Sequence, residues 1–179
     1  MAKINSAYTK KVIKHFKNPH NYGKMENYDG LGKVGNPTCG DVMWLYIKIT
    51  KNKKGEEVIK DIKFETFGCV AAISTSSIVT DLAKGKTLKE AIKIDRNSIV
   101  NALGGLPPIK LHCSVLASDA LLEAIYDFLV KNKRAVSQEL ENNHKRIEAS
   151  RHTVEEKYQD WVQIEETIHK DEKNKKNKK

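Results

Sequence analysis

Two alternating segments joined by a polar turn constrain the fold of this chain more than any other feature. The first, VMWLYIKIT at positions 42–50, places apolar side chains such as Leu45 on one face. The second, VIKDIKFETF at positions 58–67, alternates in the same way around Ile62 and Phe64. A side-chain period of two is typical of half-buried strands, and a short polar linker favours antiparallel pairing. The sequence therefore predicts a β-hairpin.

Helical patterns account for most of the chain around this hairpin. A short helix is predicted before Pro19, a longer one after Cys69, two short ones next, and a long one at Cys113. The Gly- and Asn-rich residues 20–41 predict an ordered loop. Strands and helices are segregated along the chain, so the predicted fold is α+β, a small antiparallel sheet with helices packed on one face. The phosphate-binding patterns GxGxxG and GxxxxGKS/T are absent from the sequence, which disfavours a nucleotide-dependent enzyme.

The three cysteines of the chain all lie at junctions between predicted elements. Cys39 precedes the first strand, Cys69 follows the second, and Cys113 lies at the start of the last long helix. Because the start of one hairpin strand lies beside the end of the other, Cys39 and Cys69 are expected at the same end of the sheet. Gly40 and Gly68 flank them and permit tight turns and a close approach of the backbone to a ligand.

The stretch LPPIKLHCS, residues 106–114, brings a His-Cys pair to the start of a helix. Its two prolines favour an extended conformation before the helix. Unpaired backbone N–H groups at a helix N-terminus create a positive potential, which predicts that Cys113 is held as a thiolate. His112 offers an imidazole beside that thiolate, and Asp41 offers a carboxylate two residues after Cys39.

Three thiolates with one oxygen or nitrogen ligand suit either tetrahedral Zn²⁺ or an iron–sulfur cluster. The fourth ligand is open between Asp41 and His112. The ligands are dispersed rather than paired in CxxC motifs, so the site is expected to release its metal more readily than a structural zinc site. Three unrelated core cysteines are an alternative, since free cysteine is often buried. A Cys-His nucleophile pair fits less well, because the adjacent His112 and Cys113 side chains need not face each other and no orienting third group is evident.

Composition limits the cellular setting and the partners. Three cysteines without an N-terminal apolar segment argue against a disulfide framework and for a reducing cytoplasm. No run approaches the roughly 20 apolar residues of a membrane span, so a soluble protein without membrane association is expected.

The net charge of +9 is spread thinly, with 19 Lys/Arg against 13 Asp/Glu in residues 1–130, and no motif for nucleic acid accompanies it. These charges are best explained as a solvated basic surface, which would attract an acidic protein rather than nucleic acid.

Four stretches together resemble the U-type iron–sulfur cluster assembly scaffolds, the IscU and NifU N-terminal family. They are YTKKVIKHFKNPHNYG, GNPTCGD, FGCVAAISTSS and LPPIKLHCSVLASDA, and they fall within residues 8–130. The resemblance implies a fold of about three antiparallel strands with helices packed on them. It also implies an assembly site made of five residues: Cys39, Asp41, Cys69, His112 and Cys113.

The resemblance further implies the activity of that site. A scaffold of this family is not an enzyme. It receives persulfide sulfur from a cysteine desulfurase on one of three candidate thiols, those of Cys113, Cys39 and Cys69. With Fe²⁺ it forms a [2Fe–2S] cluster, or a [4Fe–4S] cluster as the larger alternative, and passes it to apo iron–sulfur proteins. Zn²⁺ is expected to occupy the same ligands when no cluster is present.

The prolines of the LPPIK stretch have two interpretations. In the family, an LPPVK stretch docks a heat-shock chaperone that promotes cluster release, and here Ile109 replaces the valine. A linker that only stops a helix is the alternative. The residues assigned to chaperone docking are Leu106, Pro107, Pro108, Ile109 and Lys110.

Val70 is another departure from the family. Glycine usually follows the second cysteine, and the valine here is expected to stiffen that turn.

Two other classes of zinc protein compete with the scaffold assignment. Zinc-binding sulfur acceptors of the SufU branch share the fold, but they carry an insertion between the second and third cysteines and lack the LPPVK stretch. Here 44 positions separate Cys69 from Cys113, with no evident insertion. A purely structural zinc protein is the second competitor, and it would unfold on chelation, whereas a scaffold would only release its metal.

The chain beyond residue 130 lies outside this resemblance. Residues 131–169 carry a sparse apolar stripe in a highly charged sequence and predict a helical extension of one long or two shorter helices. Residues 170–179 predict a disordered basic tail. This division leaves residues 1–130 as the scaffold domain. The stripe is expected to pack against that domain or to support a homo-oligomer.

Overall fold

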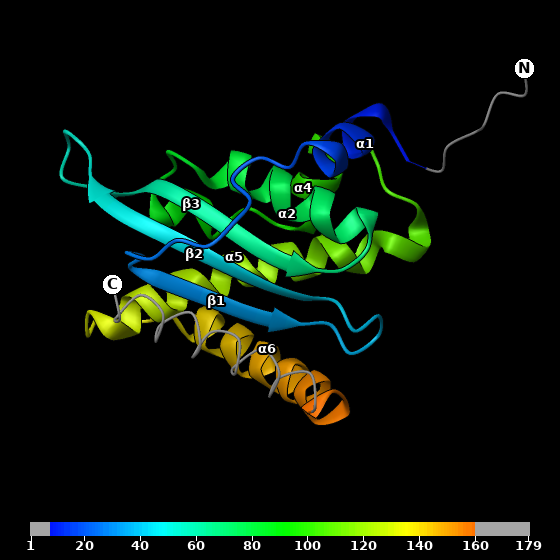
Figure 1. Cartoon of the computed structure of the whole chain (residues 1–179). Helices are drawn as coiled ribbons and strands as arrows, with labels where there is room; N and C mark the ends of the chain where they lie inside the picture. The colour runs from blue at the N-terminus through cyan, green and yellow to red at the C-terminus, as the bar shows by residue number, and fades with distance from the viewer. Residues whose placement is uncertain (1–7, 160–179) are drawn as a thin grey trace, which may run out of the picture.

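A computed structural model of the chain describes residues 8–159. An antiparallel sheet lies at its centre, with the strands in the order β1–β2–β3 (Figure 1). The predicted hairpin is confirmed as the second and third strands, and the α+β class is confirmed with it. The strands are β1 (Gly30–Gly35), β2 (Val42–Lys51) and β3 (Glu57–Phe67).

Strand β1 lies within residues 20–41, for which the sequence predicts a loop, so that prediction is wrong at this point. The segment GLGKVG carries little strand signal, because glycine is depleted in strands. Its glycines have a packing role instead. A β-carbon at Gly30 or Gly32 would collide with the carbonyl oxygen of Ala124 or Ala120, respectively, in the long helix α5 (Leu111–Lys131). Without those β-carbons, α5 packs directly on this edge strand.

The helices lie where their periodicity predicts them. Four begin with a side-chain cap, from Thr9, Thr87, Asp95 and Ser137. The two α-helices without such a cap, α2 and α5, begin at or near a cysteine. In chain order the helices are α1 (Lys10–Lys17), α2 (Val70–Ala83), α3 (Leu88–Ala91), α4 (Arg96–Ala102), the 3-10 turn η1 (Pro108–Lys110), α5 (Leu111–Lys131) and α6 (Gln138–Lys157).

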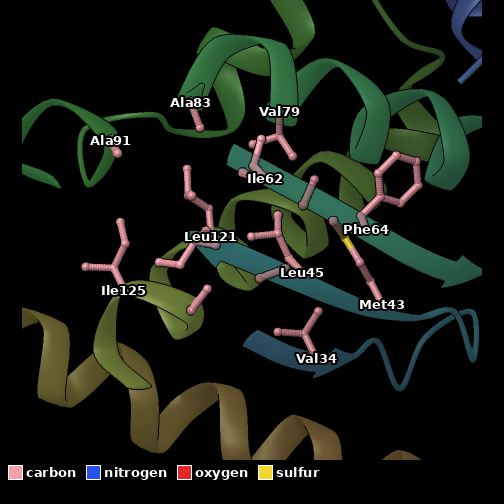
Figure 2. Packing of buried hydrophobic residues seen from close by; sticks show 14 of the residues in the cluster. Val34, Met43, Leu45, Ile62, Phe64, Val79, Ala83, Ala91, Leu121 and Ile125 are labelled. Carbon is pink, nitrogen blue, oxygen red and sulfur yellow. The ribbon is translucent and has the colours of Figure 1, made fainter. Parts of the chain in front are cut away.

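The core lies between the sheet and helices α2 and α5 (Figure 2). Met43 of β2, Phe64 of β3 and Val79 of α2 belong to this layer, and Leu121 and Ile125 of α5 complete it. All five are fully buried. Removal of such side chains from water is the main stabilising contribution, about 1.5–3 kcal/mol for each large aliphatic residue. This packing fixes the strand ends and helix starts that carry the cysteines.

The extension forms a single helix, α6, within the described residues. Its apolar stripe, Leu140, Ile147 and Val154, is buried, and α6 packs along β1 and α5 (Figure 1). Arg146 makes an ion pair with Asp119 of α5 at 2.7 Å. The stripe therefore packs against the scaffold domain, which was one of the two expectations for it. Residues 160–179, including the predicted disordered tail, lie outside the described residues.

Between residues 8 and 159, no helix combines the length and the apolar character needed to cross a bilayer.

Candidate metal centre

The register of the hairpin brings the first two predicted site segments together. Val42 pairs with Phe67 at the last rung of the β2–β3 ladder, so Asp41 and Gly68 are neighbours just beyond it. A β-carbon at Gly68 would lie 2.9 Å from Cγ of Asp41. Glycine at position 68 therefore leaves room for the Asp41 carboxylate beside Cys69.

Three of the five predicted site residues converge at this end of the sheet. Sγ of Cys113 lies 3.9 Å from Sγ of Cys69 and 3.9 Å from Oδ2 of Asp41. One ligand atom of each residue lies within 4.8 Å of the other two. Two sulfur ligands of a tetrahedral zinc ion, with bonds of about 2.3 Å, are about 3.8 Å apart. The observed sulfur–sulfur distance therefore suits a shared metal ion.

Cys39 lies near this trio without belonging to it. Its side chain is exposed on a turn in which the Gly40 N–H donates to the Asn36 carbonyl at 2.8 Å. Gly40 has a φ of +75°, a left-handed conformation that favours glycine. Partial withdrawal from water raises the pKa of the Cys39 thiol to about 11, and the negative charges of Asp41 and Cys69 also raise it. The sulfur of Cys39, the third thiol of the predicted site, therefore lies close to the other two on an exposed turn.

His112, in the first turn of α5, presents an unpaired imidazole nitrogen. Within residues 8–159, its Nε2 is the one buried side-chain nitrogen or oxygen without a hydrogen-bond partner. Such an atom costs about 1–3 kcal/mol when it is left unsatisfied. A buried nitrogen retained without a partner suits a metal ligand. His112 does not belong to the trio of closest ligand atoms.

Burial dominates the chemistry of Cys113. The residue lies in the first turn of α5, as predicted, but it is only 1% exposed. Burial raises its pKa far above the ordinary thiol value, and the neighbouring Cys69 and Asp41 raise it further. The prediction that the helix N-terminus holds Cys113 as a thiolate is therefore wrong for the metal-free protein. A bound cation is what would favour the thiolate here.

Two further residues lie beside Cys69. The Cys69 charge is the largest cause that raises the pKa of Lys110. Burial, and then Cys69, raise the pKa of Tyr8. The sequence analysis assigned Lys110 only to chaperone docking. Its position two residues before His112 could have indicated that it lies near the metal site. No sequence signal points to Tyr8, which reaches the site because α1 packs against α2.

The LPPIK stretch is less extended than predicted. Pro107 is extended, with φ −55° and ψ 139°, but Pro108–Lys110 form the 3-10 turn η1. A proline fits the first position of a helical turn, because its fixed φ matches and its missing N–H would be unpaired there. Ile109 is 79% exposed, whereas Leu106 packs partly against the core. One apolar side chain of the stretch is therefore available to a partner.

Val70, the departure next to Cys69, occupies the first position of α2. Between residues 8 and 159, Asn21 and Lys133 are the non-glycine residues with positive φ. Val70 thus has an ordinary backbone conformation, and the freedom of glycine is not needed at this position.

Comparison with known proteins gives consistent results. Residues 7–135 match the model of the NifU-like N-terminal domain. The chain is 58% identical over 125 residues to the iron–sulfur cluster assembly scaffold protein IscU 1 of Archaeoglobus fulgidus, which covers 70% of this chain and 78% of that protein. It is 50% identical over 130 residues to IscU of Buchnera aphidicola, over 71% of this chain and 99% of that protein.

A solved structure supports the fold alone. The N-terminal part of a nitrogen-fixing NifU-like protein from Brucella abortus superposes with a TM-score of 0.54, over 69% of this chain and 94% of that chain, at 19% identity. The region that matches the family model contains the sheet, helices α1 to α5 and all five predicted site residues, while α6 lies beyond it. The chain belongs to the IscU and NifU N-terminal family.

Proposed function

We propose that this protein is a scaffold on which iron–sulfur clusters are assembled and from which they pass to apo-proteins. The convergence of Asp41, Cys69 and Cys113 carries this proposal. Two sulfurs and a carboxylate lie at distances that one metal ion can bridge. The unpaired Nε2 of His112 and the thiol of Cys39 lie on adjoining segments. The relatives named above are described as assembly scaffolds.

The ligand set suits a [2Fe–2S] cargo. Each iron of such a cluster is bound by two bridging sulfides and two protein ligands, so four protein ligands are needed. Three cysteines with either Asp41 or His112 supply that number, and a [4Fe–4S] cluster is the larger alternative. Fe²⁺ is the metal to be loaded, and Zn²⁺ is expected on the same ligands when iron is absent.

Sulfur is proposed to arrive as a persulfide from a cysteine desulfurase, and each persulfide sulfur takes up two electrons, from Fe²⁺ and an external electron donor, to become the sulfide of the cluster. Cys113, Cys39 and Cys69 are the candidate acceptors. Cys39 is exposed and Cys113 is buried, so Cys39 can meet a donor without rearrangement. The chain then acts as a carrier and not as an enzyme. Three free thiols suit the reducing cytoplasm that the sequence predicts.

Release is proposed to involve a heat-shock-type chaperone at Leu106, Pro107, Pro108, Ile109 and Lys110. The exposed Ile109 supplies an apolar contact. Lys110 lies beside Cys69, so a partner that binds Lys110 would act directly on the environment of a cluster ligand. The apo iron–sulfur proteins that receive the cargo are the final partners.

Anaerobic reconstitution tests this function. The full-length protein is incubated with Fe²⁺ and sulfide, its visible absorption is recorded, and iron and sulfide are counted per chain. A scaffold gives equal amounts of iron and acid-labile sulfide, and the cluster moves to an apo-ferredoxin. A zinc-binding sulfur acceptor of the SufU type would retain Zn²⁺, accept persulfide and form no cluster. That result would replace the scaffold by this alternative, which the sulfur–sulfur distance of 3.9 Å also suits.

A further inference from the structure

A second group of metal-binding side chains lies between α1 and α2. One ligand atom from each of His15, His20 and Asp81 lies within 4.8 Å of the other two. Asp81 follows Cys69 by twelve residues, which is about 18 Å along α2 at 1.5 Å per residue. We infer that His15, His20 and Asp81 form a second metal site, separate from the cysteines, for a divalent ion such as Zn²⁺ or Fe²⁺.

The spacing of the three side chains fits one ion. Nδ1 of His20 lies 2.7 Å from Oδ2 of Asp81, and the ring centroids of His15 and His20 are 4.8 Å apart. Nitrogen and oxygen ligands of a tetrahedral ion, with bonds of 2.0–2.1 Å, lie about 3.3 Å from one another. The His20–Asp81 separation is shorter than this value, and no two of the three ligand atoms are more than 4.8 Å apart. Side-chain rotations that move atoms by about 1 Å would complete the coordination.

His15 is held in place inside the fold. It is 7% exposed. An imidazole binds a metal through the lone pair of one ring nitrogen. Its Nδ1 lies 2.8 Å from Oγ of Ser77, and the same oxygen accepts the backbone N–H of His20 at 2.8 Å. A ring nitrogen fixed in this way orients the other nitrogen, Nε2, which is the arrangement usual for metal-binding histidines.

The other two ligands are also held in place. Asn21, the residue after His20, donates from Nδ2 to Oγ1 of Thr80 at 2.9 Å and lies 3.5 Å from Oδ1 of Asp81. Asn21 has a φ of +57°, so the loop turns sharply at this point. The turn directs two successive side chains onto α2. The ligands therefore come from two segments that are already fixed to each other.

The charges of the site favour a divalent cation. When a metal is bound, two imidazoles and one carboxylate offer it a single negative charge, and two nitrogens with one oxygen suit Zn²⁺ or Fe²⁺ better than Ca²⁺ or Mg²⁺. Lys11 and Lys14 of α1 are near enough to oppose a cation. The Lys11 ammonium, however, donates to the Ala102 carbonyl at 3.1 Å. Bound metal would connect α1 and the loop after it to α2.

The test removes the thiols, which would otherwise compete for metal. The full-length, tag-free protein with Cys39, Cys69 and Cys113 all changed to Ser is titrated with Zn²⁺ by calorimetry and with Co²⁺ by absorption. One equivalent is expected, with a Co²⁺ spectrum that lacks sulfur charge-transfer bands. His20→Arg keeps a hydrogen-bond donor beside Asp81 but has no lone pair for a metal. This substitution and Asp81→Asn should each weaken binding at least tenfold.

A matched control separates this site from general binding by histidine. His152 is exposed on α6, and His152→Ala should bind metal as the parent does. Zn²⁺ should raise the unfolding temperature of the parent and not that of the His20→Arg variant.

Should the triple-serine chain not fold, the chain with its cysteines intact should bind one more equivalent of metal than its His20→Arg variant. Equal affinity, or equal stoichiometry, in parent and His20→Arg would overturn the inference. Neither result depends on cluster assembly, so the scaffold function is tested separately.

Discussion

The hydroxyl group of Tyr158 packs against Gly40, the residue between Cys39 and Asp41. A β-carbon at Gly40 would lie 3.0 Å from that oxygen. Tyr158 is the C-terminal cap of α6, so the helix beyond the family match reaches the turn that carries two proposed ligands. One turn earlier, Val154 packs against Gly35 at the end of β1, where a β-carbon would meet its side chain at 3.1 Å. The end of α6 thus supports the Cys39 turn from outside.

Tyr158→Ala is expected to shorten the lifetime of the reconstituted cluster. Without the ring the Cys39 turn gains freedom, and a ligand on a mobile turn leaves the metal more often. We expect the visible absorption to decay about threefold faster in the presence of a chelator, a change of roughly 0.7 kcal/mol in the barrier. Glu156→Ala, at an exposed position of α6, is the control. Equal decay in all three proteins would show that α6 does not support the site.

A chain that ends at Lys131 should still assemble a cluster, because all five proposed ligands precede that residue. It should also be less stable, since Leu140, Ile147 and Val154 no longer cover β1 and α5. The measurements are iron and sulfide counts after reconstitution, and the midpoint of urea unfolding. Size-exclusion chromatography of both chains would show whether the extension affects self-association. Failure of the shortened, folded chain to bind iron would mean that the extension belongs to the assembly site.

The sequence predicted the parts of the site that depend on local geometry. Cys39 and Cys69 were expected at one end of the sheet because an antiparallel hairpin leaves no other arrangement, and the structure places their segments there. Their closeness in sequence to Cys39 and Cys113 made Asp41 and His112 candidates for the fourth ligand, and the family resemblance implied both. Alternation could not reveal β1, because its glycines serve the packing of α5, a contact between residues far apart in the chain. The pKa of Cys113 was mispredicted for a similar reason. The start of a helix can be recognised from neighbouring residues, whereas the burial that raises this pKa depends on tertiary packing.

Replacement of each cysteine by serine should abolish a stable cluster and leave the fold intact. Serine is close to cysteine in volume, so little cavity is created even at the buried Cys113, and a poorly satisfied hydroxyl there costs about 1–3 kcal/mol. Each variant should retain less than about a tenth of the reconstituted iron, because one lost thiolate leaves an iron under-coordinated. Ser118→Ala on α5 is the control. Far-UV circular dichroism that showed all three variants unfolded would mean that the cysteines are structural.

The reactivity of Cys39 should depend on Asp41. The negative charge of Asp41 is one cause of the raised pKa, about 11, of the Cys39 thiol. A raised pKa means less thiolate at any pH below it, so removing the charge lowers the pKa and increases the thiolate fraction. In a metal-free chain with Cys69 and Cys113 changed to serine, Asp41→Ala should therefore speed alkylation of Cys39 at mildly alkaline pH. Glu65→Gln, on β3, serves as the control. An unchanged rate would show that Asp41 does not act on this thiol.

A longer cluster lifetime is expected from Asp41→Ala. Oδ2 of Asp41 lies 3.9 Å from Sγ of Cys113, and the carboxylate is buried, so its charge acts on the site with little screening by water. Carboxylate oxygen is a hard ligand, which binds an iron–sulfide core less tightly than thiolate or imidazole does, and it adds negative charge beside an anionic cluster. The substitution removes both effects and leaves the unpaired Nε2 of His112 free to bind iron.

The Asp41→Ala cluster should therefore last about fivefold longer in chelator, which corresponds to roughly 1 kcal/mol in the barrier, and should transfer more slowly to an apo-ferredoxin. The measurement is the decay of the visible absorption of parent and variant side by side. Asp41→Ala combined with His112→Ala is the control, because this chain lacks both candidates for the fourth ligand and should lose its cluster fastest. If Asp41→Ala alone loses its cluster faster than the parent, Asp41 is an indispensable ligand and His112 does not replace it.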